Sequence, residues 1–283
     1  MRYLVTGADG FVGSSIIAEL LSRGHSIIAT SSEHTRASTM RWFGDVEYHE
    51  LDPSLPNIDL PSSFESVDRI IHLGWSDIPK YLDMVHIEKN LMWSYWFLRR
   101  LIHAGVCDVT VLGTCLEYGM KNGEIVEETP PAPHIPYAVA KDALRRFLEQ
   151  LQGSISFRLK WVRLFYVYGP GQRLNSLVGA LDAAIDRGDS SFDMSTGEQI
   201  RDYLRIDRAA HAIVRVSEQE RVLGAINCGS GNPISVRRFV EEYISNRGGR
   251  MVLNVGRRTY PDYEPLAFWA STVKLREAID EEW

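Results

Sequence analysis

Short apolar runs alternate with helix-like segments through the first half of the chain. The runs cover residues 3–6, 26–30, 69–73, 109–113 and 161–164. Because most positions in these runs are apolar, rather than every second one, they are typical of parallel strands buried on both faces. The intervening segments are long enough for helical crossovers. The pattern predicts an α/β fold with a doubly wound parallel sheet.

The rhythm changes after about residue 166. Turn-forming clusters break the chain into shorter pieces there, at 169–171, 187–189 and 229–233. We interpret residues 1–165 as one domain, completed by about residues 204–228, and residues 166–283 as mainly a smaller C-terminal α/β lobe. Ligands of doubly wound sheets bind at the carboxyl ends of the strands, so we expect this lobe to supply the substrate half of the cleft.

Composition narrows the class of protein. The 31 basic and 37 acidic residues give a net charge of −6, which argues against a nucleic-acid partner. The three cysteines, Cys107, Cys115 and Cys228, are odd in number and lack metal-ligand spacing, so we expect a reducing compartment and no metal site. The N-terminus passes directly into Tyr3 without a signal sequence, and no apolar stretch has membrane-spanning length. We expect a cytoplasmic protein with no membrane partner.

A glycine-rich loop follows the first predicted strand. Residues 6–13 read Thr-Gly-Ala-Asp-Gly-Phe-Val-Gly, and the glycines are three residues apart, at Gly7, Gly10 and Gly13. Glycines permit a tight turn, and the backbone amides at the start of the next helix, which includes Phe11 and Val12, can bind a pyrophosphate. The pattern predicts a dinucleotide-binding loop.

This fingerprint resembles that of the extended short-chain dehydrogenase/reductase family, also called the NAD-dependent epimerase/dehydratase family, over nearly the whole chain. The resemblance implies a Rossmann-type fold and further cofactor contacts at Asp52 near the adenine, at Leu73 and Gly74, and at Asn90. Gly74 and Trp75 depart from the family's usual pair of alanines. We assign Trp75 to the wall of the substrate pocket.

The end of the second strand bears on the choice of cofactor. An NAD-selective site places a carboxylate here to accept hydrogen bonds from the adenosine ribose. This chain has Ser31 and Ser32 instead, and Arg36 is close enough in sequence to pair with a 2′-phosphate. Glu33 is the competing candidate, as a carboxylate suited to NAD. We predict NADP as the cofactor, with NAD as the alternative.

A tyrosine and a lysine begin one helix-like run. Tyr137 and Lys141 are four residues apart, which places both side chains on one face. In the family, such a pair follows a proline-rich approach, seen here at residues 128–136, and a strand bearing a catalytic hydroxyl, here Thr114. The resemblance implies that Thr114, Tyr137 and Lys141 are catalytic, and that Tyr137 and Lys141 also contact the cofactor.

The residue types suit carbonyl reduction. Hydride transfer to a ketone builds an alkoxide that must be protonated and stabilised as it forms. The Tyr137 phenol can supply the proton, and we expect the nearby Lys141 ammonium to lower the pKa of Tyr137 toward working pH. Thr114 would donate a second hydrogen bond to the same oxygen.

The positions after Thr114 separate reduction from dehydration. The sugar-nucleotide dehydratases of the family carry Asp and Glu there, and these residues eliminate water. Here Cys115 and Leu116 take their places, and neither is suited to that acid and base work at neutral pH. Glu117 follows and would point to another side if the segment is a strand. We therefore argue against 4,6-dehydration and place Cys115 in the substrate pocket.

Dispersed donors are expected to hold a nucleotide diphosphate. The resemblance implies this role for Arg201, within Gln-Ile-Arg-Asp-Tyr, and similar positions for Asn175 and Arg258. Separate donors suit a diphosphate site in a chain of net negative charge. Tyr166 replaces an asparagine that is common in the family, which leaves the sugar's identity open.

The remaining choice is between net reduction and epimerisation. A 4-epimerase of the family keeps its NAD bound, so an NADP-suited site favours a reductase. The segments Gly-Thr-Cys-x-Glu-Tyr-Gly and Arg-x-Phe-Tyr-x-Tyr-Gly look most like reductases of nucleotide-linked 4-keto-6-deoxy sugars. We predict NADPH-dependent reduction of the C4 ketone of such a deoxyhexose or deoxyheptose. The alternatives are a nucleotide-sugar epimerase with bound NAD and a non-enzymatic NADP-binding regulatory protein.

One helix predicts a homodimer. Apolar side chains surround most of the helix expected at residues 90–104, whereas packing on a sheet needs only one apolar stripe. The resemblance implies that a second copy covers the surplus, with the helix that begins near Tyr137 alongside through Ala138, Leu144 and Leu148. The alternative is that another part of the same chain covers it.

Overall fold

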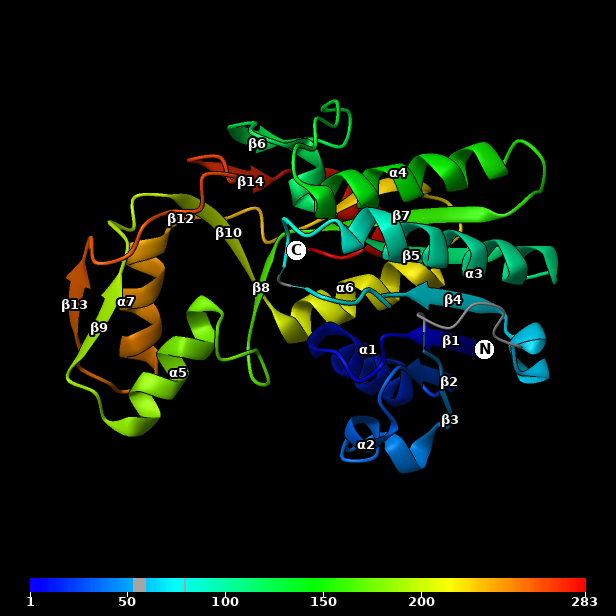
Figure 1. Cartoon of the computed structure of the whole chain (residues 1–283), viewed down its shortest axis with the longest axis horizontal. Coiled ribbons are helices and arrows are strands. Elements are labelled where there is room, and N and C mark those ends of the chain that lie inside the picture. Colours follow the sequence, from blue (N-terminus) through cyan, green and yellow to red (C-terminus); the bar gives the residue numbers. More distant parts are fainter. Residues whose placement is uncertain (53–59, 79) are drawn as a thin grey trace.

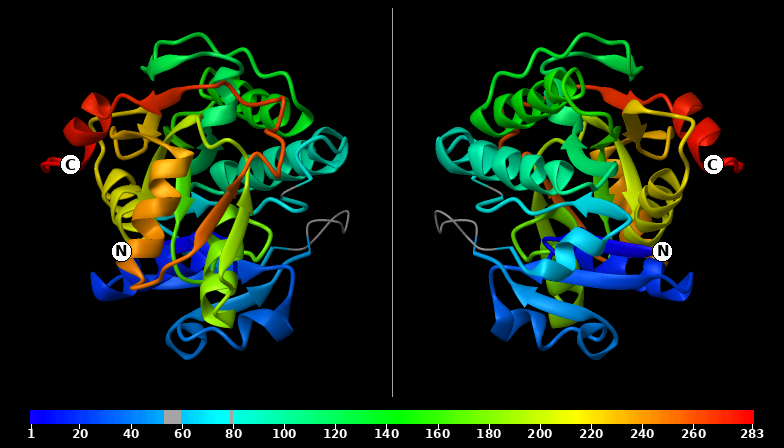
Figure 2. Two further views of the ribbon diagram at one scale, coloured as in Figure 1. Left: turned by 90° about the vertical axis from the view of Figure 1, so that its left-hand side faces the viewer. Right: turned by 90° about the vertical axis from the view of Figure 1, so that its right-hand side faces the viewer.

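The computed structural model describes residues 1–52, 60–78 and 80–283. A larger body contains the first half of the chain, and a smaller lobe lies at one end of it (Figure 1). When the molecule is viewed from that end, the lobe lies in front of the body (Figure 2, left).

Seven strands form one parallel sheet at the centre of the body. In spatial order they are β3 (Glu47–Glu50), β2 (Ser26–Ser31), β1 (Arg2–Thr6), β4 (Arg69–His72), β5 (Asp108–Thr114), β7 (Arg158–Leu164) and β11 (Gly224–Cys228). The direction of strand progression reverses between β1 and β4, which is where ligands of such sheets bind. The predicted Rossmann-type doubly wound sheet is confirmed.

Helices cover both faces of this sheet. One face carries α1 (Phe11–Ser22), α6 (Ile206–Glu218) and α8 (Val273–Ile279), and the other carries α3 (Met92–His103) and α4 (Pro136–Leu151). Shorter helices are α2 (His34–Ala37), the 3₁₀ turns η1 (Phe43–Asp45), η2 (Ser62–Ser66) and η4 (Cys115–Tyr118), and the π-helix η3 (His86–Leu91), which leads into α3. In the described part of the chain, no helix has the length and apolar character needed to cross a membrane.

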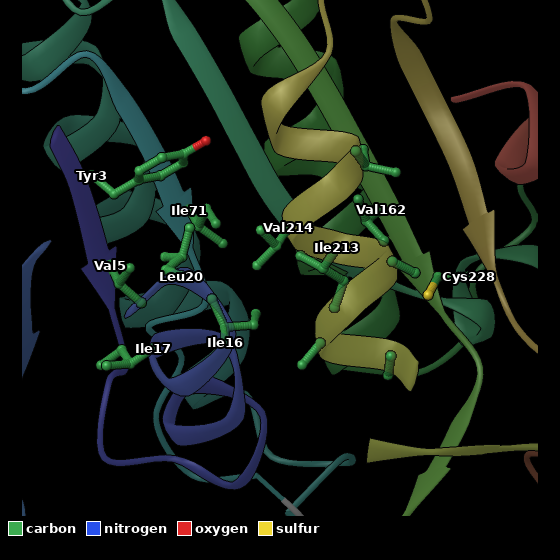
Figure 3. Close-up of a cluster of buried hydrophobic side chains, with 14 of the residues drawn as sticks. Tyr3, Val5, Ile16, Ile17, Leu20, Ile71, Val162, Ile213, Val214 and Cys228 are labelled. Carbon is green, nitrogen blue, oxygen red and sulfur yellow. The ribbon is translucent and has the colours of Figure 1, made fainter. Parts of the chain in front are cut away.

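The core follows from the alternation of side chains along each strand. Tyr3 and Val5 of β1 pack with α1 and α6, whereas Leu4 between them packs with α3 and α4. Figure 3 shows the first of these clusters, in which Ile16 of α1 and Ile213 of α6 meet the side chains of the strands. Both faces of the central strands are therefore buried, as the continuous apolar runs predict.

The smaller lobe combines two short sheets with two helices. Its strands are β8 (Tyr166–Tyr168), β10 (Ile200–Arg205) and β12 (Pro233–Ser235) in one sheet, and β9 (Ser191–Met194) paired with β13 (Val252–Val255) in the other. Its helices are α5 (Leu177–Arg187) and α7 (Val236–Asn246). Their apolar faces meet in a separate core that includes Leu181, Phe192 and Val240.

The chain crosses between body and lobe several times. Residues after the first lobe segment return to the body as α6 and β11, within the segment 204–228. The last strand, β14 (Phe268–Ala270), pairs with β6 (Gly123–Ile125), and α8 packs into the core of the body through Leu275. Sequence patterns did not indicate the return of α8 to the body.

Candidate functional site

The glycine loop between β1 and α1 has the geometry of a phosphate cradle. Gly7 has φ +66°, and a Cβ there would lie 3.0 Å from the backbone nitrogen of Gly74. A Cβ on Gly13 would lie 2.2 Å from the carbonyl oxygen of Gly7. Gly10 caps α1 without a side-chain hydrogen bond, and the first turn holds no acidic residue. The amides of Phe11 and the next residues therefore face a position suited to a pyrophosphate.

Thr6 joins this loop to the end of β4. Its Oγ1 accepts hydrogen bonds from the amides of Leu73 (3.1 Å) and Gly74 (2.9 Å) and lies 2.9 Å from Nδ1 of His72. Burial lowers the pKa of His72 to about 3, so the ring is neutral and Nδ1 can accept the Thr6 hydrogen. The predicted cofactor residues Leu73 and Gly74 thus lie directly against the loop.

The predicted adenosine contacts gather at the end of β2. Ser31 is buried, with its Oγ 2.9 Å from the hydroxyl of Tyr48, whereas Ser32 is exposed. The amide of Leu51 donates to the carbonyl of Ser31 (2.9 Å), which brings the next residue, Asp52, to the same edge of the sheet.

Arg36 lies beside the phosphate loop rather than free in solvent. Its Nε is 3.5 Å from a carboxylate oxygen of Asp9, and its side chain is 46% exposed. Burial raises the pKa of Asp9, and the Arg36 charge opposes that effect. Sequence analysis assigned no role to Asp9, although it stands inside the glycine motif. A cation and a carboxylate therefore both stand near the end of β2.

The predicted catalytic residues come together at the carboxyl edge of the sheet. Thr114 ends β5, and Tyr137 follows Pro136, which starts α4. The Thr114 side chain lies near the Tyr137 hydroxyl, where it acts to lower the pKa of Tyr137. Lys141, one turn further along α4, is 2% exposed and donates from Nζ to the carbonyl of Leu112 (2.9 Å).

The charges of this group differ from the sequence-based expectation. Burial raises the pKa of Tyr137, with further upward contributions from Tyr81 and Glu117. Burial also lowers the pKa of Lys141 to about 7. We expected the Tyr137 pKa to be lowered toward working pH, but it is raised, because desolvation is the largest effect on this buried phenol. Tyr137 is therefore held as a protonated phenol.

Glu117 supports Thr114 from inside the sheet. It is fully buried, and Oε1 accepts a hydrogen bond from the amide of Thr114 (2.8 Å). Trp161 Nε1 donates to both carboxylate oxygens (3.0 Å), and Arg163 Nε donates at 2.8 Å. The segment is the 3₁₀ turn η4 rather than a strand, and Glu117 is buried between β5 and β7. A Cβ at Gly113 would lie 2.6 Å from Oε1, so glycine is needed there.

Trp75 and His86 form a wall beside Lys141. The Lys141 Nζ lies 3.9 Å from the centroid of the Trp75 ring, and Trp75 Nε1 donates to His86 Nδ1 (3.0 Å). Because His86 Nε2 donates to the carbonyl of Lys80 (2.9 Å), Nδ1 must act as the acceptor. The amide nitrogen of Asn90 lies 3.2 Å from the same Nδ1. Trp75 and Asn90 thus both contact the His86 ring, and Trp75 also contacts Lys141.

The predicted substrate residues divide into separate groups. Asn175 and Arg258 line one cavity of about 130 Å³ in the smaller lobe, together with Phe192 and Met194. Cys115 is buried next to Thr114, and burial raises the pKa of its thiol. Arg201 is not among the residues that line the cavity. It is buried, and its Nη2 donates to Glu264 Oε2 (2.9 Å).

Sequence analysis missed an aromatic and charged group near Tyr137. The carbonyl of Tyr81 accepts a hydrogen bond from the Tyr137 amide (3.2 Å), and the two rings are 5.2 Å apart. Tyr263 lies 6.2 Å from Tyr81, next to Glu264 in the chain. No sequence pattern marks these loop residues, which follow Arg258 in the chain. Among the residues described, no cluster of His, Cys, Asp or Glu is suited to hold a metal ion.

Comparisons with known proteins agree with this geometry. A family model described as the NAD dependent epimerase/dehydratase family matches residues 3–229. The chain is 29% identical to a dTDP-6-deoxy-L-talose 4-dehydrogenase (NAD(+)) from Aggregatibacter actinomycetemcomitans. This match covers 96% of the chain and 100% of the relative. It is also 22% identical to a dTDP-4-dehydro-6-deoxyglucose reductase from Escherichia coli, in a match that covers 98% of the chain and 95% of the relative.

The fold is also found in a solved epimerase. The crystal structure of UDP-glucuronic acid 4-epimerase from Bacillus cereus, in complex with UDP-glucuronic acid and NAD, superimposes with a TM-score of 0.83 at 22% identity. The match covers 100% of this chain and 94% of the epimerase chain. The glycine cradle, the parallel sheet and the match to the family model lead to one conclusion: the chain belongs to the NAD-dependent epimerase/dehydratase family, the extended short-chain dehydrogenases/reductases.

Proposed function

We propose that this chain catalyses the NADPH-dependent reduction of the C4 ketone of a nucleotide-linked 4-keto-6-deoxy sugar, a deoxyhexose or deoxyheptose. The observation that carries the proposal is the arrangement of Tyr137, a buried and protonated phenol, against Thr114, with Lys141 one helical turn away. The dTDP-sugar dehydrogenase and dTDP-sugar reductase among its relatives support the same substrate class.

The residues divide the work of reduction. A bound nicotinamide cofactor would supply the hydride, and the residues of the glycine loop, with Asn90 and the end of β2, would hold it. The Tyr137 hydroxyl gives its proton to the oxygen that becomes negative, while Thr114 donates a hydrogen bond to the same atom. Lys141, when charged, stabilises the Tyr137 phenolate left behind.

The neighbours of Thr114 disfavour dehydration. Cys115 is a buried thiol whose pKa is raised by burial, and Leu116 is apolar, so neither is suited to remove or add a proton at neutral pH. An epimerase remains the second candidate, because the fold matches the solved 4-epimerase closely. A raised pKa of Tyr137 favours the donor role, whereas an epimerase must first remove the proton of the C4 hydroxyl as the C4 hydride passes to NAD, which needs a base. A non-enzymatic NADP-binding regulator would have no need of the three catalytic side chains.

NADP is the proposed cofactor. Ser31 and Ser32 take the positions where an NAD-selective strand carries a carboxylate, and Arg36 is exposed enough to turn toward a 2′-phosphate. Asp9 and the NAD(+) in the name of the talose dehydrogenase favour NAD instead. We give more weight to Arg36, because a flexible cation can leave Asp9 for a doubly charged phosphate.

A homodimer is proposed through α3 and α4. Trp96 is 50% exposed, and Met92, Val139 and Phe147 are exposed apolar side chains on the same two helices. The expectation that Ala138, Leu144 and Leu148 face the partner was wrong, because all three are buried in the chain's own core. We also propose that the enzyme works in the cytoplasm, where NADPH is supplied and its free thiols stay reduced.

Replacing Tyr137 with phenylalanine tests the chemistry. The ring is kept and the proton donor is lost, so turnover should fall by about two or more orders of magnitude while NADPH binding persists. Consumption of NADPH is followed with dTDP-, GDP- and CDP-linked 4-keto-6-deoxy sugars, and Tyr95→Phe is the matched control. Near wild-type turnover by Tyr137→Phe would show that Tyr137 is not the donor. Interconversion of two sugars without net NADPH consumption would point to the epimerase.

The pH dependence of kcat/KM tests Lys141. Burial lowers its pKa to about 7, so the cation that stabilises the phenolate is present below about pH 7 and is lost as pH rises through that value. The value of kcat/KM for reduction should fall above about pH 7 by about tenfold per unit. Any residual activity of Lys141→Arg should lack this decline, since arginine stays charged. A wild-type profile that is flat from neutral to alkaline pH would contradict the role given to Lys141.

Replacing Arg36 with alanine tests the cofactor. NADPH should bind more tightly than NADH to the wild type, and Arg36→Ala should narrow that gap by about 1 to 3 kcal/mol. Calorimetric titration measures both affinities, and Arg187→Ala, an exposed arginine on the smaller lobe, is the control. Equal wild-type affinities for the two cofactors would reject NADP and strengthen the epimerase alternative.

Replacing Trp96 with glutamate tests the dimer. The wild type should sediment at equilibrium with the mass of two chains at micromolar concentration. The new charge should weaken association by about 2 kcal/mol or more, because large aromatic side chains dominate interface energy. Val252→Glu, an exposed apolar position on β13, should leave the mass unchanged. A wild type with the mass of one chain at all concentrations would refute the dimer.

A further inference from the structure

Arg201 already has an anionic partner within the chain. Its Nη2 donates to Glu264 Oε2 (2.9 Å), and its Nη1 donates to the carbonyls of Ile200 (2.9 Å) and Leu266 (3.2 Å). Only 2% of the Arg201 side chain and 15% of the Glu264 side chain are exposed. The ion pair is therefore largely shielded from water. This shielding strengthens the attraction between the two charges.

The partner of Arg201 comes from a loop that reaches both ends of the proposed substrate site. Residues 256–267 connect β13 to β14, and Arg258 near the start of this loop lines the cavity that Asn175 also lines. Further along, Tyr263 lies 6.2 Å from Tyr81, whose ring is 5.2 Å from Tyr137. Glu264 thus follows the point at which the loop reaches the catalytic group.

This inference rests on the proposed function, in which a nucleotide sugar binds and Arg201 holds its diphosphate. We propose that Glu264 is an internal competitor of that diphosphate for Arg201. The Glu264 carboxylate occupies the guanidinium face that a phosphate would take, and the nucleotide sugar binds by exchanging one anion for the other.

The chemistry of the two anions favours the exchange. Glu264 accepts a hydrogen bond from Nη2 of Arg201, and a phosphate that binds the guanidinium competes for this donor. Two anions against one buried cation also repel each other, which makes a shared arrangement unfavourable. A diphosphate carries more charge than a carboxylate and can displace it, whereas a ligand without phosphate cannot.

The loop allows Glu264, rather than Arg201, to move. Arg201 is held on β10, which pairs with β8 on one side and β12 on the other. Glu264 belongs to a connection that is outside regular elements over most of its length and begins with Gly256 at φ +79°. Because Tyr263 is adjacent to Glu264, the exchange also moves the aromatic side chain that contacts Tyr81. Glu264 therefore links recognition of the diphosphate to the surroundings of the catalytic tyrosine.

Removing the charge of Glu264 tests the competition directly. Glu264→Gln keeps the shape of the side chain but binds Arg201 less well, so the Kd for a nucleoside diphosphate should fall by about tenfold. Calorimetry with dTDP, UDP, GDP and CDP measures this Kd on the NADPH-loaded protein. The corresponding nucleosides should bind equally to wild type and variant. Glu241→Gln, an exposed acid on α7 that pairs with Arg237, should bind every nucleotide as the wild type does.

A second variant tests whether Arg201 carries the effect. In Arg201→Gln the gain from Glu264→Gln should vanish, so Arg201→Gln and the double variant should have the same Kd. A Glu264→Gln variant that binds the diphosphates no better than the wild type would overturn the proposal, as would a gain that persists without Arg201. A wild type that binds none of the diphosphates would instead overturn the proposed function, and the competition with it. A failure of the competition therefore appears in the variants, whereas a failure of the proposed function appears already in the wild type.

Discussion

The buried carboxylate of Glu117 is the contact on which the catalytic edge of the sheet depends. It accepts hydrogen bonds from the Thr114 amide at the end of β5 and from Trp161 and Arg163 on β7. Removing a carboxylate from such a site leaves a buried cation and donors without partners, which costs several kcal/mol. Because Thr114 is fixed through its own backbone, its hydroxyl is positioned by the fold before any substrate arrives.

Much of the fold could be predicted from the sequence, because local patterns have direct physical causes. Continuous apolar runs predicted strands buried on both faces, and the sheet is parallel throughout its seven strands. The glycine loop could be placed because backbone crowding excludes side chains at Gly7 and Gly13. The spacing of Tyr137 and Lys141 predicted a shared helical face, and both side chains reach the end of β5, where Thr114 lies.

The remainder depended on contacts between distant segments. The Arg201 and Glu264 side chains are 63 residues apart in the chain, and no periodic pattern links them. The pKa of Tyr137 depends mainly on burial in the folded chain, with contributions from Tyr81 and Glu117. The Tyr-x-x-x-Lys spacing does not reveal this burial. The rotation of α4 about its axis could not be predicted either, so Leu144 and Leu148 were assigned to a dimer interface, whereas they are buried and Phe147 is exposed.

The path of the chain through the two parts of the molecule also sets an order of assembly during synthesis. The smaller lobe takes α5 and β9 from one excursion out of the body, and α7 and β13 from a second that follows β11. Its core therefore cannot close until the second excursion has left the ribosome. The proposed catalytic residues all lie at or before Lys141, on segments that are made first. A nascent chain thus contains Thr114, Tyr137 and Lys141 before the smaller lobe, the proposed substrate half of the site, can fold.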